Sequence, residues 1–212
     1  MDRLKKELSK QEKFFLIIIP VIIAVVFCCF FIWNGIKKTD VAILLWVSKW
    51  NTPTLTEIMK WITNLCSPIV ILLIVLCLLL FMKNKKISCL ITINLFFCAL
   101  VNYILKFIFS RQRPLEFMLI DQAGYSFPSG HSMVSMAFYG FIIFLIYKLV
   151  KTKWIKIASI TILTLVIFSI AFSRIYLGVH YPSDVIVGLT CGYVYIILFL
   201  KMVKSYMLNT KV

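Results

Sequence analysis

Residues Ile87–Leu105 read ISCLITINLFFCALVNYIL, and Lys106 follows directly. These 19 residues include no charged side chain, and a helix needs about 20 apolar residues to cross a hydrocarbon core about 30 Å thick. Lipid offers no partners for backbone N–H and C=O groups, so the segment must be helical. We therefore expect a membrane-spanning helix that ends at a lysine.

Five more apolar runs flank this segment, and hydrophobic residues make up 62% of the chain. Soluble domains have about 45–50%. The first run is too long for a signal peptide and lacks a small-residue cleavage site, so we expect it to be retained. Gly188 and Gly192, four residues apart, favour a close helix contact. We predict one all-α domain over residues 1–212, a six-transmembrane-helix bundle with spans at about 14–33, 65–82, 87–105, 133–147, 154–172 and 185–200.

The net charge is +15, and most lysines lie just outside the apolar runs. With six spans, fifteen Lys and Arg residues fall on the side of the N-terminus and eight on the other. The positive-inside rule then puts both termini in the cytoplasm of a multi-pass plasma-membrane protein. Membrane topology explains the charge, so no nucleic-acid partner is expected.

The segment of about 40–61, between spans one and two, is too polar to cross a membrane. It contains Trp46, Trp50 and Trp61, and tryptophan is typical of the membrane–water interface. We expect an amphipathic interfacial helix on the outer leaflet, with an ordinary folded loop as the alternative.

Three polar stretches interrupt the apolar pattern, all on the outer side. In the first, Lys106 precedes Arg113 by seven residues, and Pro114 follows. Proline disfavours a helix at the residue before it, so Arg113 is expected where the chain turns. Two cations suit a phosphate dianion, although basic residues at the interface are the alternative. We expect Asn102, one helical turn before Lys106, to support that lysine.

The second stretch runs from Tyr125 to Ser132 and contains Pro128-Ser129-Gly130-His131. Ser129 is a natural N-cap, and Gly130 permits close approach of a ligand to the backbone. Free N–H groups at a helix start attract anions, and His131 can exchange a proton near neutral pH. A plain helix cap with a structural histidine is the alternative.

The third stretch contains Arg174, His180 and Asp184. The histidine and the aspartate are four residues apart, so the carboxylate can orient the imidazole. A structural Asp–His pair is the alternative. Both histidines of the chain thus lie on the face that carries the cations, which favours phosphoryl transfer. The seven cysteines include no CxxC pair, and a single carboxylate suits neither magnesium nor calcium. We expect no metal and no cofactor.

The patterns K-x6-R-P, P-S-G-H and S-R-x5-H-x3-D, from Lys106 to Asp184, resemble the tripartite signature of the type 2 phosphatidic acid phosphatase superfamily. That superfamily also includes the vanadium haloperoxidases. The six-span layout looks like its bacterial membrane branch, which includes phosphatidylglycerophosphate and undecaprenyl pyrophosphate phosphatases.

The resemblance implies a role for each residue. His180 would be the nucleophile, Asp184 would orient it, and His131 would act as acid and then base. The phosphate would be bound by Lys106, Arg113, Ser129, Gly130 and Arg174. The expected function is hydrolysis of a phosphomonoester or pyrophosphate of a lipid in the bilayer. Binding or transport of phosphorylated lipid without hydrolysis, and a purely structural membrane protein, are the alternatives.

Overall fold

The computed structural model describes residues 35–208, and this part of the chain is helical without any strand. The prediction of an all-α fold is confirmed, while the first expected span, 14–33, lies outside the described residues. The helices are α2 (Gly35–Ser48), α3 (Pro53–Asn64), α4 (Pro68–Phe81), α5 (Lys85–Phe109), the short 3-10 helix η1 (Leu115–Phe117), α6 (Gly130–Leu149), α7 (Lys153–Tyr176) and α8 (Pro182–Leu208).

Four helices, α5 to α8, are long and apolar enough to cross a membrane, and each contains one of the predicted spans. The predicted span 65–82 differs. Its helix α4 has 14 residues, fewer than the about 20 that a span needs. With α3, which meets it at an angle of 41°, it forms a bent pair that adds a fifth candidate. The described residues therefore hold four or five candidate spans.

The segment 40–61 is divided between α2 and α3 and is not one continuous helix. The break covers residues 49–52 and ends just before Pro53. Thr52 has an extended backbone, and its side chain accepts a hydrogen bond from the N–H of Leu55, which caps α3. A capping threonine followed by proline at the first helical position begins a new helix here.

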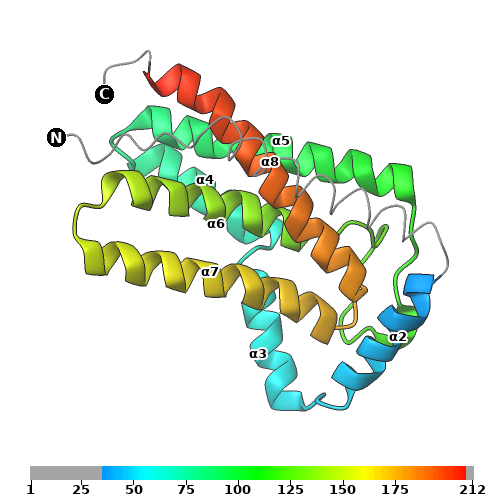
Figure 1. The fold of residues 1–212 in the computed structure, drawn as a ribbon. Helices are drawn as coiled ribbons and strands as arrows, with labels where there is room; N and C mark the ends of the chain where they lie inside the picture. Colours follow the sequence, from blue (N-terminus) through cyan, green and yellow to red (C-terminus); the bar gives the residue numbers. More distant parts are fainter. Residues whose placement is uncertain (1–34, 209–212) are drawn as a thin grey trace.

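Helices α5 to α8 run alternately up and down the bundle (Figure 1). The connections 110–129 and 177–181 consequently lie at the same end, and α2 lies beside that end. The short connections 82–84 and 150–152 lie at the opposite end. This alternation brings together the three polar stretches of the sequence.

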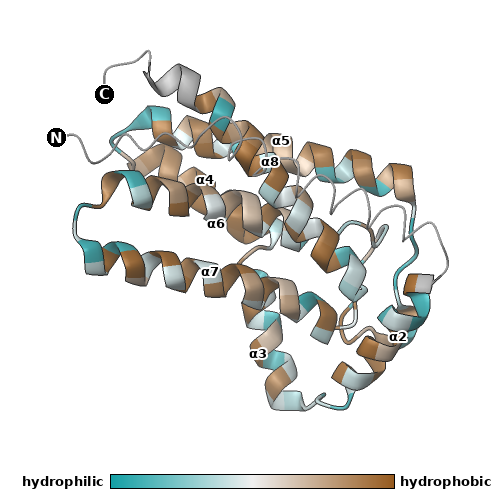
Figure 2. Ribbon diagram, viewed as in Figure 1, coloured by the Kyte–Doolittle hydropathy of each residue, from teal (hydrophilic) through white to brown (hydrophobic). Residues whose placement is uncertain are grey.

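Apolar residues make up most of the long helices of the bundle, as the brown of the ribbon in Figure 2 shows. Large hydrophobic side chains on α4 and α5 are strongly exposed, including Ile69, Leu80, Phe81, Phe96 and Ile108. A water-soluble monomer rarely exposes such large contiguous patches, and a lipid bilayer would cover them.

Helix α8 packs closely against α6, as the two glycines predict. A Cβ atom on Gly188 would lie 2.6 Å from the carbonyl oxygen of Ser129, and one on Gly192 would lie 2.6 Å from that of Met133. Any larger residue would force the helices apart. The glycines therefore fix the start of α6 against α8.

The turn between α7 and α8 depends on Gly178. Its φ is +66°, and a Cβ atom there would lie 1.8 Å from the carbonyl oxygen of Phe117. The neighbouring Leu177 carbonyl accepts a hydrogen bond of 3.0 Å from the N–H of Leu119. The turn that carries His180 is thus fixed against the 110–129 connection.

Replacing Gly178 with alanine should lower the unfolding temperature of the purified protein in detergent. Gly124→Ala is the matched control, because Gly124 also has a positive φ, +77°, but no atom lies within 4 Å of its Cβ position. Both changes add left-handed strain of about 1–2 kcal/mol, and only Gly178→Ala adds a backbone clash. Equal small decreases for the two variants would contradict this packing.

Candidate active site

The three polar stretches meet at a cavity of about 560 Å³. Of the eight site residues predicted from the sequence, six line this cavity: Lys106, Arg113, Gly130, His131, Arg174 and His180. The other two, Ser129 and Asp184, are fully buried behind it. The fold thus gathers residues that span nearly eighty positions of the chain.

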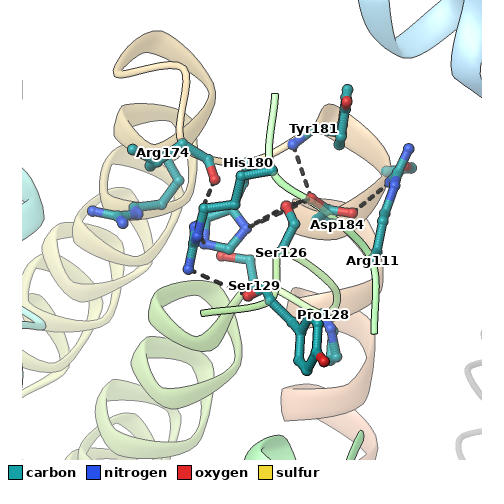
Figure 3. Close-up of polar contacts among 12 residues, drawn as sticks. Arg111, Ser126, Pro128, Ser129, Arg174, His180, Tyr181 and Asp184 are labelled. Carbon is teal, nitrogen blue, oxygen red and sulfur yellow. Dashed lines mark hydrogen bonds and ion pairs between the residues drawn. The ribbon is translucent and has the colours of Figure 1, made fainter. Parts of the chain in front are cut away.

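His180 lies at the end of the 177–181 connection and is 2% exposed. Its Nδ1 atom is 3.6 Å from Oδ2 of Asp184, which is long for a direct hydrogen bond. The hydroxyl of Ser126 connects the two groups: it lies 3.3 Å from Nδ1 and donates to Oδ2. The expected pairing of His180 and Asp184 is present, with Ser126 as a bridge (Figure 3).

The other ring nitrogen of His180, Nε2, is 3.2 Å from Nη1 of Arg113. A guanidinium group only donates hydrogen bonds, so Nε2 must carry the lone pair and Nδ1 the proton. Burial lowers the pKa of His180 to about 3, although the Asp184 carboxylate raises it. His180 is therefore neutral near pH 7, with a lone pair on the nitrogen that a nucleophile would use.

Asp184, in the first turn of α8, accepts several hydrogen bonds. Its Oδ1 atom accepts from Arg111 at 2.5 Å, and Oδ2 accepts from Ser126 and from the N–H of Tyr181 at 2.9 Å. Its backbone carbonyl also accepts from the N–H of Ser129. Asp184 is thus held rigidly and joins α8 to the start of α6.

Arg113 lies in the loop after α5, where the chain turns, as expected. Burial lowers its pKa to about 10, with a partial offset from Asp184, so it stays cationic near pH 7. Besides His180, its guanidinium contacts backbone carbonyls, namely those of Gly124 (2.9 Å), Val179 (2.6 Å), Ala123 (3.1 Å) and Tyr125 (3.3 Å). Through these hydrogen bonds Arg113 connects the loop segment 123–125 with the turn that carries His180.

Lys106 also contacts this loop, since its Nζ atom donates to the carbonyls of Tyr125 (2.5 Å) and Ser126 (3.3 Å). The expectation that Asn102 supports Lys106 is wrong. The Asn102 amide donates instead to the carbonyl of Pro128 at 3.4 Å. A Cβ atom on Gly130 would lie 3.0 Å from Oδ1 of Asn102, so a larger residue there would press on this amide.

Arg174 is 1% exposed and is held from two directions. Its Nη1 donates to the hydroxyl of Thr63 at 2.7 Å, and its Nη2 donates to Oε1 of Gln122 at 2.8 Å. Its buried Nε–H has no acceptor among residues 36–203. An unsatisfied buried donor costs about 1–3 kcal/mol, and an anion in the cavity would remove that cost.

Ser129 and His131 form the start of α6. The Ser129 hydroxyl accepts from the N–H of Ser132 at 3.4 Å, which confirms the N-cap. This hydroxyl therefore faces its own helix. His131 is half-buried and lines the cavity, so the positive end of the helix dipole and one imidazole face the same space.

The sequence reasoning missed Ser126, Arg111, Thr63 and Gln122. Ser126 lies three residues before Ser129 in the same polar stretch, and this position was the one signal in the sequence that could have identified it. Arg111 lies two residues before Arg113, in the same loop. Thr63 and Gln122 carried no comparable signal, because each is a single polar residue outside the three motifs.

A comparison with protein-family models matches residues 86–207 to the PAP2 superfamily. The chain therefore belongs to this family. Together with the relatives described next, this match makes it a membrane lipid phosphatase. The match covers the three motifs and α5 to α8 almost completely.

Among curated relatives, phosphatidylglycerophosphatase B of Bacillus subtilis is 31% identical over 164 residues, which is 75% of this chain and 80% of that protein. Undecaprenyl-diphosphatase of Sulfolobus acidocaldarius is 31% identical over 121 residues, 54% of each chain. Among solved structures, the transmembrane PAP2 type phosphatidylglycerolphosphate phosphatase of Bacillus subtilis matches with a TM-score of 0.82 and 25% identity, over 93% of this chain and 98% of that one.

Replacing Ser126 with alanine should lower kcat, because the hydroxyl that bridges His180 and Asp184 is lost. A hydrogen bond to a charged group contributes about 1.5–3 kcal/mol, so we expect a decrease of about ten- to a hundredfold in lipid phosphate hydrolysis. The matched control is Ser135→Ala, which removes a buried serine hydroxyl that donates to a backbone carbonyl of its own helix. Equal rates for the two variants would contradict the bridge.

Proposed function

We propose that this PAP2 enzyme hydrolyses the phosphomonoester or pyrophosphate of a membrane lipid through a phosphohistidine on His180. Phosphatidylglycerophosphate and undecaprenyl pyrophosphate are the leading candidate substrates, because relatives are named for acting on them. The main support is the neutral His180, which lines one cavity together with Lys106, Arg113 and Arg174 and whose Nε2 carries a lone pair that accepts from Arg113.

In the first step, Nε2 of His180 attacks phosphorus and the bond from phosphorus to the lipid oxygen breaks. His131 is protonated beside the bound phosphate dianion, because an opposite charge favours the cationic form, and it donates this proton to the leaving oxygen. The imidazole of His180 becomes positively charged as the N–P bond forms. Asp184 stabilises this charge through Ser126 and through space.

In the second step, a water molecule attacks the phosphohistidine, and His131 now accepts the proton of that water. The N–P bond breaks, inorganic phosphate leaves, and His180 is again neutral. The same histidine serves as acid and then as base, so the cycle needs no further proton donor.

The phosphate oxygens are bound by the cations and by the start of α6. The Nε–H of Arg174 takes one oxygen, and the N–H groups of Gly130 and His131 take others, with the helix dipole behind them. Lys106 exchanges a loop carbonyl for a phosphate oxygen. Arg113 exchanges its contact with Nε2 of His180 for another phosphate oxygen, which frees the lone pair for attack. Ser129 contributes mainly by capping the helix that presents these N–H groups.

The lipid part of the substrate lies against the apolar wall of the same cavity. This wall is formed by side chains at the start and along the length of α4 and α5, among them Pro68, Ile71, Leu72, Val75, Leu95 and Ala99. A lipid can place its headgroup among the cations while its chain stays in the bilayer. We therefore favour a lipid over a small soluble phosphate ester.

The active site should face the outside of the cell, with residues 1–212 as one domain and both termini in the cytoplasm. The support is the charge at the end of the bundle opposite the site, where the two short connections and their flanking helix ends carry Lys83, Lys85, Lys86, Lys148, Lys151 and Lys153. Cytoplasmic loops are enriched in such residues.

A panel of defined lipid phosphates, tested with purified protein in detergent, should show release of inorganic phosphate. His180→Ala should lose this activity. In His131→Ala the rate of phosphate release should fall by about 10²–10⁴-fold, the usual contribution of general acid–base catalysis. Wild-type activity in His180→Ala would contradict the proposal. Lipid binding without phosphate release by the wild type would favour transport.

Chelation with EDTA should leave the activity unchanged. Within residues 35–208, no group of three or more His, Cys, Asp or Glu side chains is placed to hold a metal ion. The cations of the site then replace a metal in neutralising the phosphate. Loss of activity with EDTA, restored by magnesium, would overturn this part of the proposal.

A further inference from the structure

Asp40 belongs to α2 and is 3% exposed. It lies outside residues 86–207, which match the family model and contain all three motifs. A buried carboxylate is costly unless hydrogen bonds and opposite charges satisfy it. The hydrogen-bond partners of the Asp40 carboxylate therefore indicate what role this residue has.

Two residues next to the active site satisfy the carboxylate of Asp40. Oδ1 accepts from the N–H of Ser183 at 3.0 Å. Oδ2 accepts from the Ser183 hydroxyl at 2.6 Å and from Nη2 of Arg111 at 2.8 Å. Since Ser183 precedes Asp184 in the first turn of α8, Asp40 binds the start of the helix that carries Asp184.

Arg111 connects the two carboxylates. Its Nη1 donates to Asp184 and to the hydroxyl of Ser183, at 2.5 and 2.9 Å, while Nη2 donates to Asp40. Its guanidinium carbon also lies 3.9 Å from the ring centroid of Tyr181, a distance typical of cation–π contact. Figure 3 shows Arg111 on the side of Asp184 that is turned away from His180.

We propose that Asp40 and Arg111 are positioning residues that set the place and the charge of Asp184 for the reaction at His180. This inference rests on the proposed phosphohistidine mechanism. With Arg111 alone, the positive charge would cancel the negative charge of Asp184. Arg111 also pairs with Asp40, so the carboxylates of Asp40 and Asp184 together with one guanidinium carry one net negative charge. That charge stabilises the imidazolium that forms when His180 is phosphorylated.

The variant Asp40→Asn keeps the shape of the side chain and removes the charge. We expect kcat to fall about tenfold or more, the size associated with neutralising one hydrogen-bonded charge near a transition state. KM should change less than about twofold by the same logic, because ground-state lipid binding is untouched. Glu57→Gln is the control, since it removes an exposed carboxylate on α3 that pairs with Lys60.

A second variant distinguishes the effect of the Asp40 charge from the effect of its hydrogen bonds, which hold α2 against the start of α8. Asp40→Asn combined with Arg111→Gln restores one net negative charge around Asp184 but removes more hydrogen bonds. The charge mechanism predicts that this double variant has a higher kcat than Asp40→Asn alone. A merely structural role predicts a further loss. Arg111→Lys should stay closer to the wild type than Arg111→Gln does, because glutamine leaves the neighbouring carboxylates of Asp40 and Asp184 without the cation that holds both of them in place.

Wild-type kcat in Asp40→Asn would overturn the inference, and so would a double variant that is no faster than Asp40→Asn. The kinetics are compared for variants that elute as the wild type does in detergent. If Asp40→Asn fails to fold, the pair Arg111→Lys and Arg111→Gln decides the question, and equal kcat values for the two would overturn it. His180→Ala distinguishes this failure from failure of the proposed function: it is inactive if only the positioning inference is wrong.

Discussion

The hydrogen bonds of one buried carboxylate, Asp184, hold the active site together. Its side chain accepts from Arg111, Ser126 and the N–H of Tyr181, and its backbone carbonyl accepts from the N–H of Ser129. These four contacts tie the loop after α5, the start of α6 and the turn before α8 to a single residue. A buried carboxylate is costly unless donors such as these satisfy it. The segments that carry the donors are therefore held in place around Asp184.

The apolar helices provide the frame for this polar cluster. Gly188 and Gly192 allow α8 to touch the backbone of α6, and Gly178 permits the tight turn that brings His180 back toward the bundle. Because α5 to α8 alternate in direction, both long connections reach the same end. The cavity at this end is lined by apolar residues of α4 and α5 and by cationic residues such as Lys106 and Arg113, which suits the lipid headgroup site that we propose.

Much of this arrangement could be predicted from the sequence, because ionisable residues at membrane depth are rare and costly. The spans of α5 to α8 and the meeting of Lys106, His131, Arg174 and His180 followed from run lengths and spacing. The break between α2 and α3, the hydrogen bonds of Arg113 with loop carbonyls, and the bridge through Ser126 did not. Each depends on which backbone groups lie nearby after folding, and Asp40 has no motif that connects it with a residue more than a hundred positions away.

The identity of the nucleophile is tested most directly by trapping the intermediate. The enzyme is mixed with a lipid substrate labelled at the transferable phosphate, quenched within one turnover, and digested for mass spectrometry. We expect an acid-labile phosphoryl group on the peptide that contains His180, attached to its imidazole. A label on the peptide that contains His131, or release of phosphate with no labelled histidine at any quench time, would contradict the mechanism.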